Sequence, residues 1–207
     1  MEFEPRDRAV YLPDADTLVC ADLHVGRDAA SNVEFRVGEH EDLRERFRAL
    51  CDHYEPAETV VAGDLLHSFD RLPRGVVETV RALRAAAESV DCRLVVTPGN
   101  HDSMLGEVWD GPTPEEYRID GADGSVVAVH GHAPPTTDAD WYVVGHDLLM
   151  LPAFSRLPAG VEVNEMRAGD FRSPLIEAAG GLRPIVRDET ADRTHEFPPL
   201  SEFRRLL

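Results

Sequence analysis

Five short segments of the chain carry carboxylate, imidazole and carboxamide groups, which are side chains that bind metal ions. They are Asp22-Leu23-His24, Gly63-Asp64, Gly99-Asn100-His101-Asp102, His130-Gly131-His132 and Gly145-His146. Imidazole favours transition metals, so this set suits Mn²⁺, Fe²⁺ or Zn²⁺ better than Mg²⁺ or Ca²⁺. Each segment alone is a weak indication, because Asp and Asn also favour turns. Five of them in order predict a metal centre.

Each segment directly follows a predicted strand. Short apolar runs, typical of buried strands, cover residues 17–21, 58–62 and 94–97. Amphipathic patterns between them predict helices over 39–54 and 73–90. This order predicts a partly parallel sheet, and such sheets place ligands at the carboxyl ends of their strands.

The second half of the chain is richer in predicted strands. The candidates are residues 117–119, 125–130, 141–144, 148–151 and 160–163. We expect these strands to form a second sheet packed on the first, and the stretch from Gly180 onward to be irregular. The chain shows no repeat or linker, so we predict a single domain over residues 1–207.

Local geometry explains why neighbouring residues can share an ion. Asp22 and His24 are two apart, and side chains two apart on an extended segment leave the same face. Gly63 and Gly99 precede Asp64 and Asn100, and glycine permits a tight turn and close backbone approach to an ion.

The charge balance is unusual. There are 39 acidic residues against 21 basic ones, for a formal net charge of −18, and every basic residue is arginine. Such a chain repels itself at low ionic strength, whereas in roughly 1 M salt the Debye length falls to about 3 Å. We interpret the composition as adaptation to a salt-rich cytoplasm. An ordinary acidic protein from a GC-rich genome is the alternative.

The cysteine content and the distribution of apolar residues indicate the cellular compartment. Cys20, Cys51 and Cys92 are too far apart for a CxxC zinc site, and an odd number suits a reducing cytoplasm. No run of 18 or more apolar residues exists, which argues against a membrane span. The acidic N-terminus lacks the apolar region of a secretory signal, so we expect a cytoplasmic protein.

The order of the five segments resembles the calcineurin-like metallophosphoesterase superfamily, whose pattern is DxH, GD, GNH(D/E), H and GHxH. Residues 21–26, 63–68 and 151–154 also resemble its small branch of archaeal and DNA-ligase-associated phosphoesterases. The resemblance implies an α/β fold, a four-layer αββα sandwich of two mixed sheets flanked by helices. It also implies two divalent ions between the sheets, with Mn²⁺ expected and Fe²⁺, Zn²⁺ or Ni²⁺ as alternatives.

The resemblance carries metal-ligand roles onto particular residues. Asp22 and His24 match ligands of the first metal, and Asp64 matches the carboxylate that bridges both metals. Ligands of the second metal are matched by Asn100, His130 and His146.

The same resemblance implies the catalytic residues. His101 matches the general acid near the leaving-group oxygen, and Asp102 its orienting partner. Two cations about 3.5–4 Å apart can hold a bridging hydroxide that attacks phosphorus. We expect His132 to hold a ligand or the phosphate, and His67 either to contact substrate or to be a turn histidine with satisfied hydrogen bonds.

The last motif departs from the family pattern. Leu148 stands where the second histidine of GHxH belongs, which leaves the first metal site one ligand short. Asp147 is an alternative ligand, although adjacent residues on a strand point to opposite faces. The junction after His146 is also short, through either a deletion in the protein or a loop absent from the sequence.

These features predict a divalent-metal-dependent phosphoesterase that hydrolyses phosphodiesters of nucleotides or nucleic-acid ends. The diester preference rests on analogy with the branch, as does any DNA repair partner. Alternatives are a phosphomonoesterase, a nuclease, or a catalytically impaired scaffold with the same fold. A nuclease needs a DNA-binding face, and the sequence has no basic or aromatic-rich stripe.

Overall fold

The computed structural model describes most of the chain, namely residues 2–27, 38–67, 70–122, 124–131, 148–156, 166–171 and 173–204. The chain divides into two compact units. The first comprises Met1–His130 and Leu151–Pro158, and the second comprises Gly131–Met150 and Ala159–Leu207. The single domain over residues 1–207 stays a prediction. Among the described residues, no helix is both long enough and apolar enough to cross a membrane.

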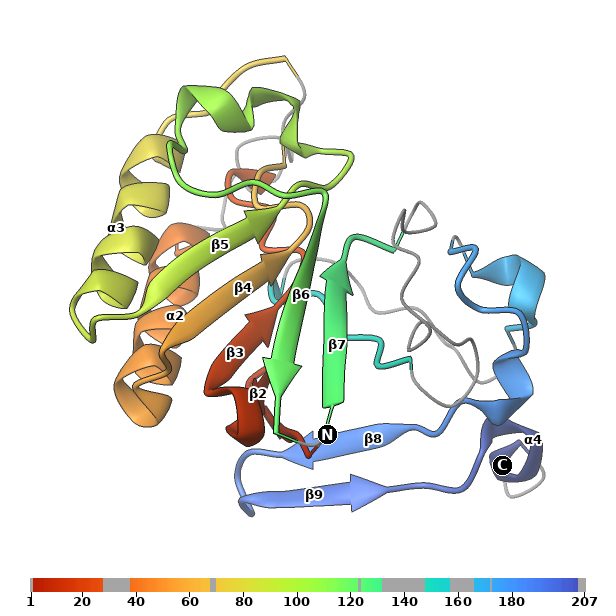
Figure 1. Cartoon of the computed structure of the whole chain (residues 1–207). Helices are drawn as coiled ribbons and strands as arrows, with labels where there is room; N and C mark the ends of the chain where they lie inside the picture. Colours follow the sequence, from red (N-terminus) through yellow and green to blue (C-terminus); the bar gives the residue numbers. More distant parts are fainter. Residues whose placement is uncertain are drawn as a thin grey trace. The chain divides into compact units, whose positions relative to one another are not determined.

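Five strands of the first unit form one sheet, in which they follow one another in chain order (Figure 1). β1, β2 and β3 pair antiparallel, whereas β3, β4 and β5 pair parallel. The parallel part is the predicted unit, so the carboxyl ends of three strands lie at one edge. The strands are Glu4–Arg6 (β1), Ala9–Leu12 (β2), Thr17–Cys20 (β3), Glu58–Ala62 (β4) and Arg93–Thr97 (β5).

The first two strands are absent from the sequence-based prediction. Asp7 and Arg8 connect them, with φ angles of 42° and 65°. Positive φ at both central residues is the conformation of a tight hairpin turn whose twist matches that of the strands. Glycine and asparagine usually occupy such positions, so Asp-Arg carries no strong turn signal.

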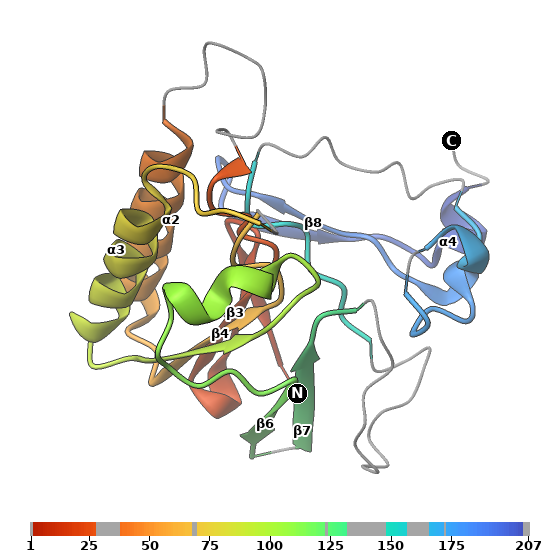
Figure 2. The ribbon, with the colours of Figure 1, turned by 90° about the horizontal axis from the view of Figure 1, so that it is seen from above.

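Two helices cover one face of this sheet, α2 (Glu39–Tyr54) and α3 (Val76–Glu88) (Figures 1 and 2). The bounds of α2 are those predicted. α3 begins three residues later than predicted, because Gly75 adopts a left-handed φ of 91° directly before it. Its apolar side faces the sheet and α2, as the periodicity of Val76, Val80 and Leu83 requires.

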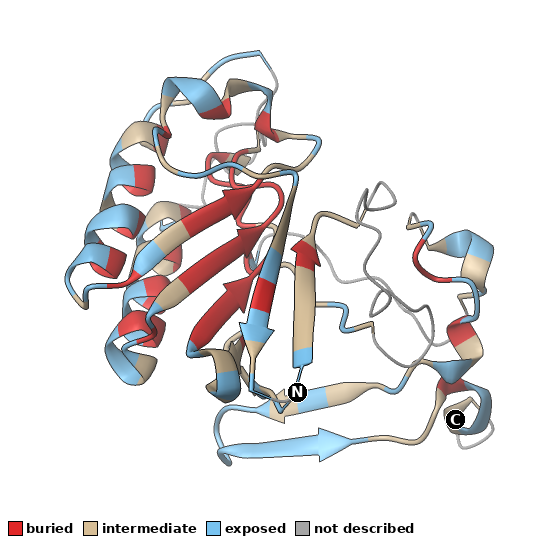
Figure 3. Cartoon of the chain, viewed as in Figure 1, coloured by how far each residue is buried: buried red, intermediate tan, exposed pale blue. Residues whose placement is uncertain are grey.

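The opposite face of the sheet packs against a hairpin, β6 (Glu116–Gly121) and β7 (Gly124–Val129). Successive side chains of β3 lie on opposite faces of the sheet: Leu18 and Cys20 belong to the apolar cluster with the helices, and Val19 to the cluster with the hairpin. Both faces of the central strands are therefore buried, which the red strands of Figure 3 show. A sheet covered on both faces reads as the continuous apolar run seen in the sequence.

The predicted α/β fold is confirmed, with helices, a mixed sheet and a second sheet as layers. In the described part of the first unit, the second sheet has two antiparallel strands rather than a mixed set. Apart from α2 and α3, the described helical elements of that unit are short 3-10 segments. The second helical layer of the predicted four-layer sandwich is therefore not among the described elements.

The second unit contains a hairpin, β8 (Ile185–Asp188) and β9 (Arg193–Glu196), and a short helix, α4 (Leu200–Phe203). The prediction that the stretch from Gly180 onward is irregular is therefore wrong. Both strands of the hairpin are short and largely exposed, so they carry no alternating apolar pattern that the sequence could reveal. Residues 148–151 form no strand either. The predicted strands over 141–144 and 160–163 lie outside the described residues.

A buried arginine ties three parts of the first unit together. Arg46 of α2, 7% exposed, forms ion pairs with Asp42 on its own helix and with Asp7 of the β1–β2 turn. Its guanidinium also donates to the carbonyl oxygen of Phe154 at 2.5 Å and stacks on the Phe154 ring. Arg156 adds a second pair with each of the two carboxylates.

Replacing this guanidinium tests how much the network stabilises the unit. Arg46→Met keeps an apolar stem but leaves a buried carbonyl and two carboxylates with one partner fewer, so we expect the free energy of unfolding to fall by roughly 3 kcal/mol. The control is Arg48→Met, because Arg48 pairs with Asp52 at the surface and should contribute less than about 1 kcal/mol. Urea denaturation at constant high KCl measures both. Equal effects of the two variants would contradict a special role for Arg46.

Candidate metal centre

The segments that follow β3, β4 and β5 meet at one edge of the sheet. The backbone N–H of Asp22 donates to the carbonyl of Gly63 at 3.1 Å, and that of His24 donates to the carbonyl of Asp64 at 2.9 Å. The N–H of His101 donates to Asp64 Oδ1 at 2.9 Å. These bonds bring predicted site residues from three strand ends together, as the topology requires.

Asp22 and His24 reach the centre by a different route from the one predicted. β3 ends at Cys20, and both residues adopt the left-handed conformation, with φ of 53° and 48°. The prediction that they project from one face of an extended strand is therefore wrong. The left-handed residues bend the chain after the strand, and the side chains still converge on Asp64, with ligand atoms of all three residues within 4.8 Å of one another. Asp64 is itself left-handed, with a φ of 45°.

Asp64 uses its two carboxylate oxygens differently. Oδ1 accepts the backbone bond from His101, whereas Oδ2 lies 3.8 Å from His24 Nε2 and 3.7 Å from His130 Nε2. The residue is 3% exposed. One oxygen of a buried carboxylate therefore faces histidines from two different parts of the site.

Two groups of ligand atoms adjoin Asp64. On one side, single ligand atoms of Asp22, His24 and Asp64 all lie within 4.8 Å of one another. On the other side, His130 Nε2 lies 3.1 Å from Asn100 Oδ1. His130 Nδ1 is also 3.6 Å from Asp22 Oδ1, so the two groups are contiguous.

Burial shapes the ionisation of these groups. It raises the pKa of Asp22 to about 6, with the neighbouring charge of Asp64 adding to the effect and His130 opposing it. Burial lowers the pKa of His24 to about 4, against the attraction of Asp64. At neutral pH Asp22 is therefore mostly ionised and His24 is neutral, which are the protonation states that a metal ligand needs.

His101 and Asp102 are held in ways that the sequence does not show. His101 Nδ1 lies 2.9 Å from the carbonyl oxygen of His67, and a carbonyl only accepts, so Nδ1 carries the hydrogen. In the neutral ring the acceptor lone pair is therefore on Nε2. Asp102 is predicted to orient this ring, and in the structure its carboxylate accepts hydrogen bonds from backbone amides.

The Asp102 carboxylate accepts from three backbone N–H groups, those of Leu65, Leu66 and Gly99, at 3.2, 2.8 and 2.8 Å. Burial raises the pKa of Asp102, while these three donors act against the shift. The residue thereby joins the loop after β4 to the loop after β5. Its role as the orienting partner of His101 stays a prediction.

Two glycines leave the space that the site occupies. A Cβ atom at Gly63, where φ is 85°, would lie 2.0 Å from His130 Nδ1. A Cβ atom at Gly99 would lie 2.1 Å from Asp64 Oδ1 and 2.5 Å from Asp64 N. Any other residue at either position would displace a predicted ligand, so these glycines let the backbone lie close to the ligand side chains.

The donor set fits divalent cations. Asp22 Oδ1, His24 Nδ1 and His67 Nδ1 are buried and have no hydrogen-bond partner among the described residues. Buried polar atoms without partners are rare, and ions are a common explanation. Carboxylate, imidazole and carboxamide donors together suit a transition-metal ion. His132 and His146 lie outside the described residues, so their part in the site stays a prediction.

One segment near the site is marked in the sequence only by the family resemblance of residues 151–154, which does not indicate what the segment contacts. The N–H of Phe154 donates to the carbonyl of Ala21 at 2.8 Å, and the N–H of Ser155 donates to that of Asp22 at 3.3 Å. Residues 153–156 thus run beside the turn that carries Asp22, and the Arg46 network anchors them there. Only a long-range contact could reveal this role.

Gly99 offers a sharp test of the arrangement. In Gly99→Ala the new methyl group must displace the Asp64 carboxylate, so we expect metal affinity to fall roughly 10–100-fold and the unfolding free energy by roughly 1–3 kcal/mol. Gly106→Ala is the control, because a Cβ atom there meets nothing within 4 Å. Calorimetric titration with Mn²⁺ measures the affinity. Unchanged binding by Gly99→Ala would show that Asp64 is not a ligand.

Comparison with known proteins identifies the family and the fold of the chain. The family of calcineurin-like phosphoesterases matches residues 16–151. A similar solved structure is the crystal structure of nuclease MPE from Pseudomonas putida, with a TM-score of 0.59 and 19% identity, covering 95% of this chain and 100% of that one. At this identity the likeness shows the fold alone. No curated protein matches the chain. The family match spans about two thirds of the sequence and includes all five segments in full, so the chain belongs to the calcineurin-like phosphoesterase family.

Proposed function

We propose that the protein is a divalent-metal-dependent phosphodiesterase that acts on nucleotides or on nucleic-acid ends. Family membership supports metal-dependent hydrolysis of phosphoesters. The preference for diesters is a finer proposal, consistent with the nuclease named among similar structures. The strongly acidic chain, with a net charge of −18, makes a small diester a better expected substrate than a long nucleic acid.

The observation that carries the proposal is the position of Asp64 between two sets of donors. Its Oδ2 atom lies within 3.8 Å of a histidine nitrogen on each side, from His24 and from His130. A carboxylate in that position can serve two cations at once. We infer that Asp22, His24 and Asp64 hold one ion, and that Asp64, Asn100 and His130 hold the other, together with His146.

Ions bound by these residues would supply positive charge that stabilises phosphoryl oxygens and lowers the pKa of water. The chain supplies the rest. Gly63 and Gly99 let the backbone approach closely, and Asp102 fixes the two loops that bear Asp64 and His101. His101, with Nδ1–H fixed on the His67 carbonyl, can deliver a proton from Nε2 to the departing oxygen.

The first experiment compares hydrolysis of bis-p-nitrophenyl phosphate with that of p-nitrophenyl phosphate in molar KCl with Mn²⁺, with and without excess chelator. We expect the diester to be cleaved faster, and the chelator to abolish cleavage. Faster cleavage of the monoester would replace the proposal with a phosphomonoesterase. Cleavage of neither ester, despite bound metal, would favour a scaffold whose site has lost function, in keeping with Leu148 in place of the last histidine.

The role of His101 predicts a leaving-group dependence. His101→Ala should slow hydrolysis of esters with poor leaving groups by roughly 10²–10⁴, because no residue then protonates the departing oxygen. Activated nitrophenyl esters need little protonation and should be slowed much less. Steady-state rates over a series of leaving groups, with metal content measured on the same samples, provide the test. Equal slowing across the series would contradict the general-acid role.

A further inference from the structure

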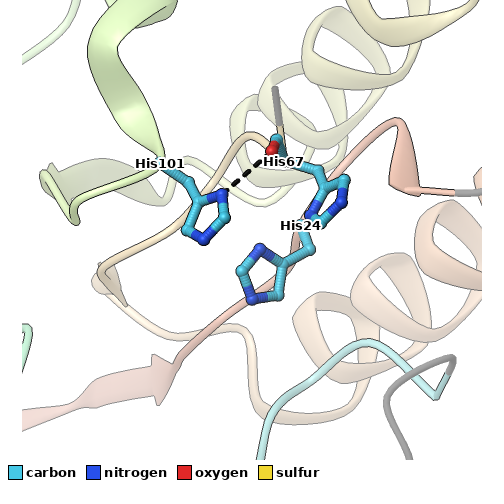
Figure 4. Close-up of side chains that lie close together, drawn as sticks. All are labelled: His24, His67 and His101. Carbon is cyan, nitrogen blue, oxygen red and sulfur yellow. Dashed lines mark hydrogen bonds between the residues drawn. The ribbon is translucent and has the colours of Figure 1, made fainter. Parts of the chain in front are cut away.

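Three histidines gather on one side of the candidate centre. His24, His67 and His101 each offer a ring nitrogen, and these atoms all lie within 4.8 Å of one another. Figure 4 shows the three rings turned toward one another from three separate loops. The rings of His67 and His101 are stacked at 5.3 Å between centroids, and His24 meets both edge-on at 5.3 and 5.1 Å.

The protein itself leaves two of these rings with unmet hydrogen-bonding capacity. Nδ1 of His24 and Nδ1 of His67 are buried and have no hydrogen-bond partner among the described residues. An imidazole nitrogen is either a donor or an acceptor, so each such atom costs free energy when it is removed from water unpaired. Two of them in one cluster call for a ligand that can meet both.

We propose that His24, His67 and His101 form an imidazole-only site for a late first-row divalent cation such as Zn²⁺. Three neutral nitrogen donors favour Zn²⁺, Ni²⁺ or Cu²⁺ over the harder Mn²⁺ and Mg²⁺, which prefer oxygen. His67 distinguishes this site, because the group of Asp22, His24 and Asp64 does not include it.

The imidazole site and the carboxylate group share His24. A neutral imidazole has one lone pair, so His24 binds one cation at a time. A cation held by the three histidines therefore competes with the ion that Asp22 and Asp64 hold. It also occupies His101, so, if the proposed function is correct, the same cation inhibits hydrolysis. The binding proposal itself does not depend on that function.

The test measures metal binding by the purified, metal-free full-length chain without substrate. Loss of a residue that only supports a metal ligand lowers metal affinity roughly 10–100-fold. His67 is a proposed ligand, so we expect His67→Gln to weaken Zn²⁺ affinity by at least that factor. Mn²⁺ affinity should stay within about twofold, because Mn²⁺ prefers the carboxylate group. Asp22→Asn should do the reverse and weaken Mn²⁺ more than Zn²⁺. His53→Gln, a change at an exposed histidine of α2, is the matched control.

Electron paramagnetic resonance with half an equivalent of Cu²⁺ identifies the ligands. The wild-type spectrum should show coupling to three nitrogens, and that of His67→Gln to two. The proposal is overturned if His67→Gln binds Zn²⁺ as His53→Gln does, or if the wild type shows fewer than three nitrogens. Equal loss of Mn²⁺ and Zn²⁺ binding in His67→Gln would also overturn it, since His67 would then support the carboxylate group or the fold.

Discussion

The carboxylate of Asp102 holds together the two loops on which most of the centre stands. It accepts backbone bonds from Leu65, Leu66 and Gly99, and it is 6% exposed. A buried carboxylate without donors would be costly, and so would buried amides without an acceptor, so each stabilises the other. Asp64 and His67 belong to one of these loops and His101 to the other. Their mutual geometry therefore depends on these hydrogen bonds, together with those that His101 makes to Asp64 and to the His67 carbonyl.

The centre also requires backbone conformations that are energetically unfavourable for its residues. Asp22, His24 and Asp64 are all left-handed, although none is a glycine. Such residues cost free energy and persist only where the surroundings determine them. Here the surroundings are the bonds between the three loops and the segment around Ser155, which binds the carbonyl of Asp22. The strained turn is thus maintained by a stretch of chain more than a hundred residues away.

Charge is distributed to suit this arrangement. The chain carries a net charge of −18, yet a buried cation anchors the 153–156 segment: the Arg46 guanidinium donates to the carbonyl oxygen of Phe154. The site itself concentrates carboxylates and neutral imidazoles, with Asp64 almost fully buried. Carboxylates and imidazole lone pairs gathered in this way need positive charge beside them. The family to which the chain belongs is one in which metal ions meet that need.

The sequence alone determined the α/β class, the bounds of α2 and β4, and the residue types at the strand ends, because these depend on local periodicity and on short motifs. It did not reveal the β1–β2 hairpin, whose Asp-Arg turn lacks glycine, or the later start of α3 after Gly75. Tertiary structure decided how the side chains meet. The left-handed turn at Asp22, the backbone partners of Asp102 and the gathering of His67 with His24 and His101 all depend on contacts between distant loops. No local pattern encodes such contacts, because their energy arises only when three strand ends are brought to one edge of a sheet.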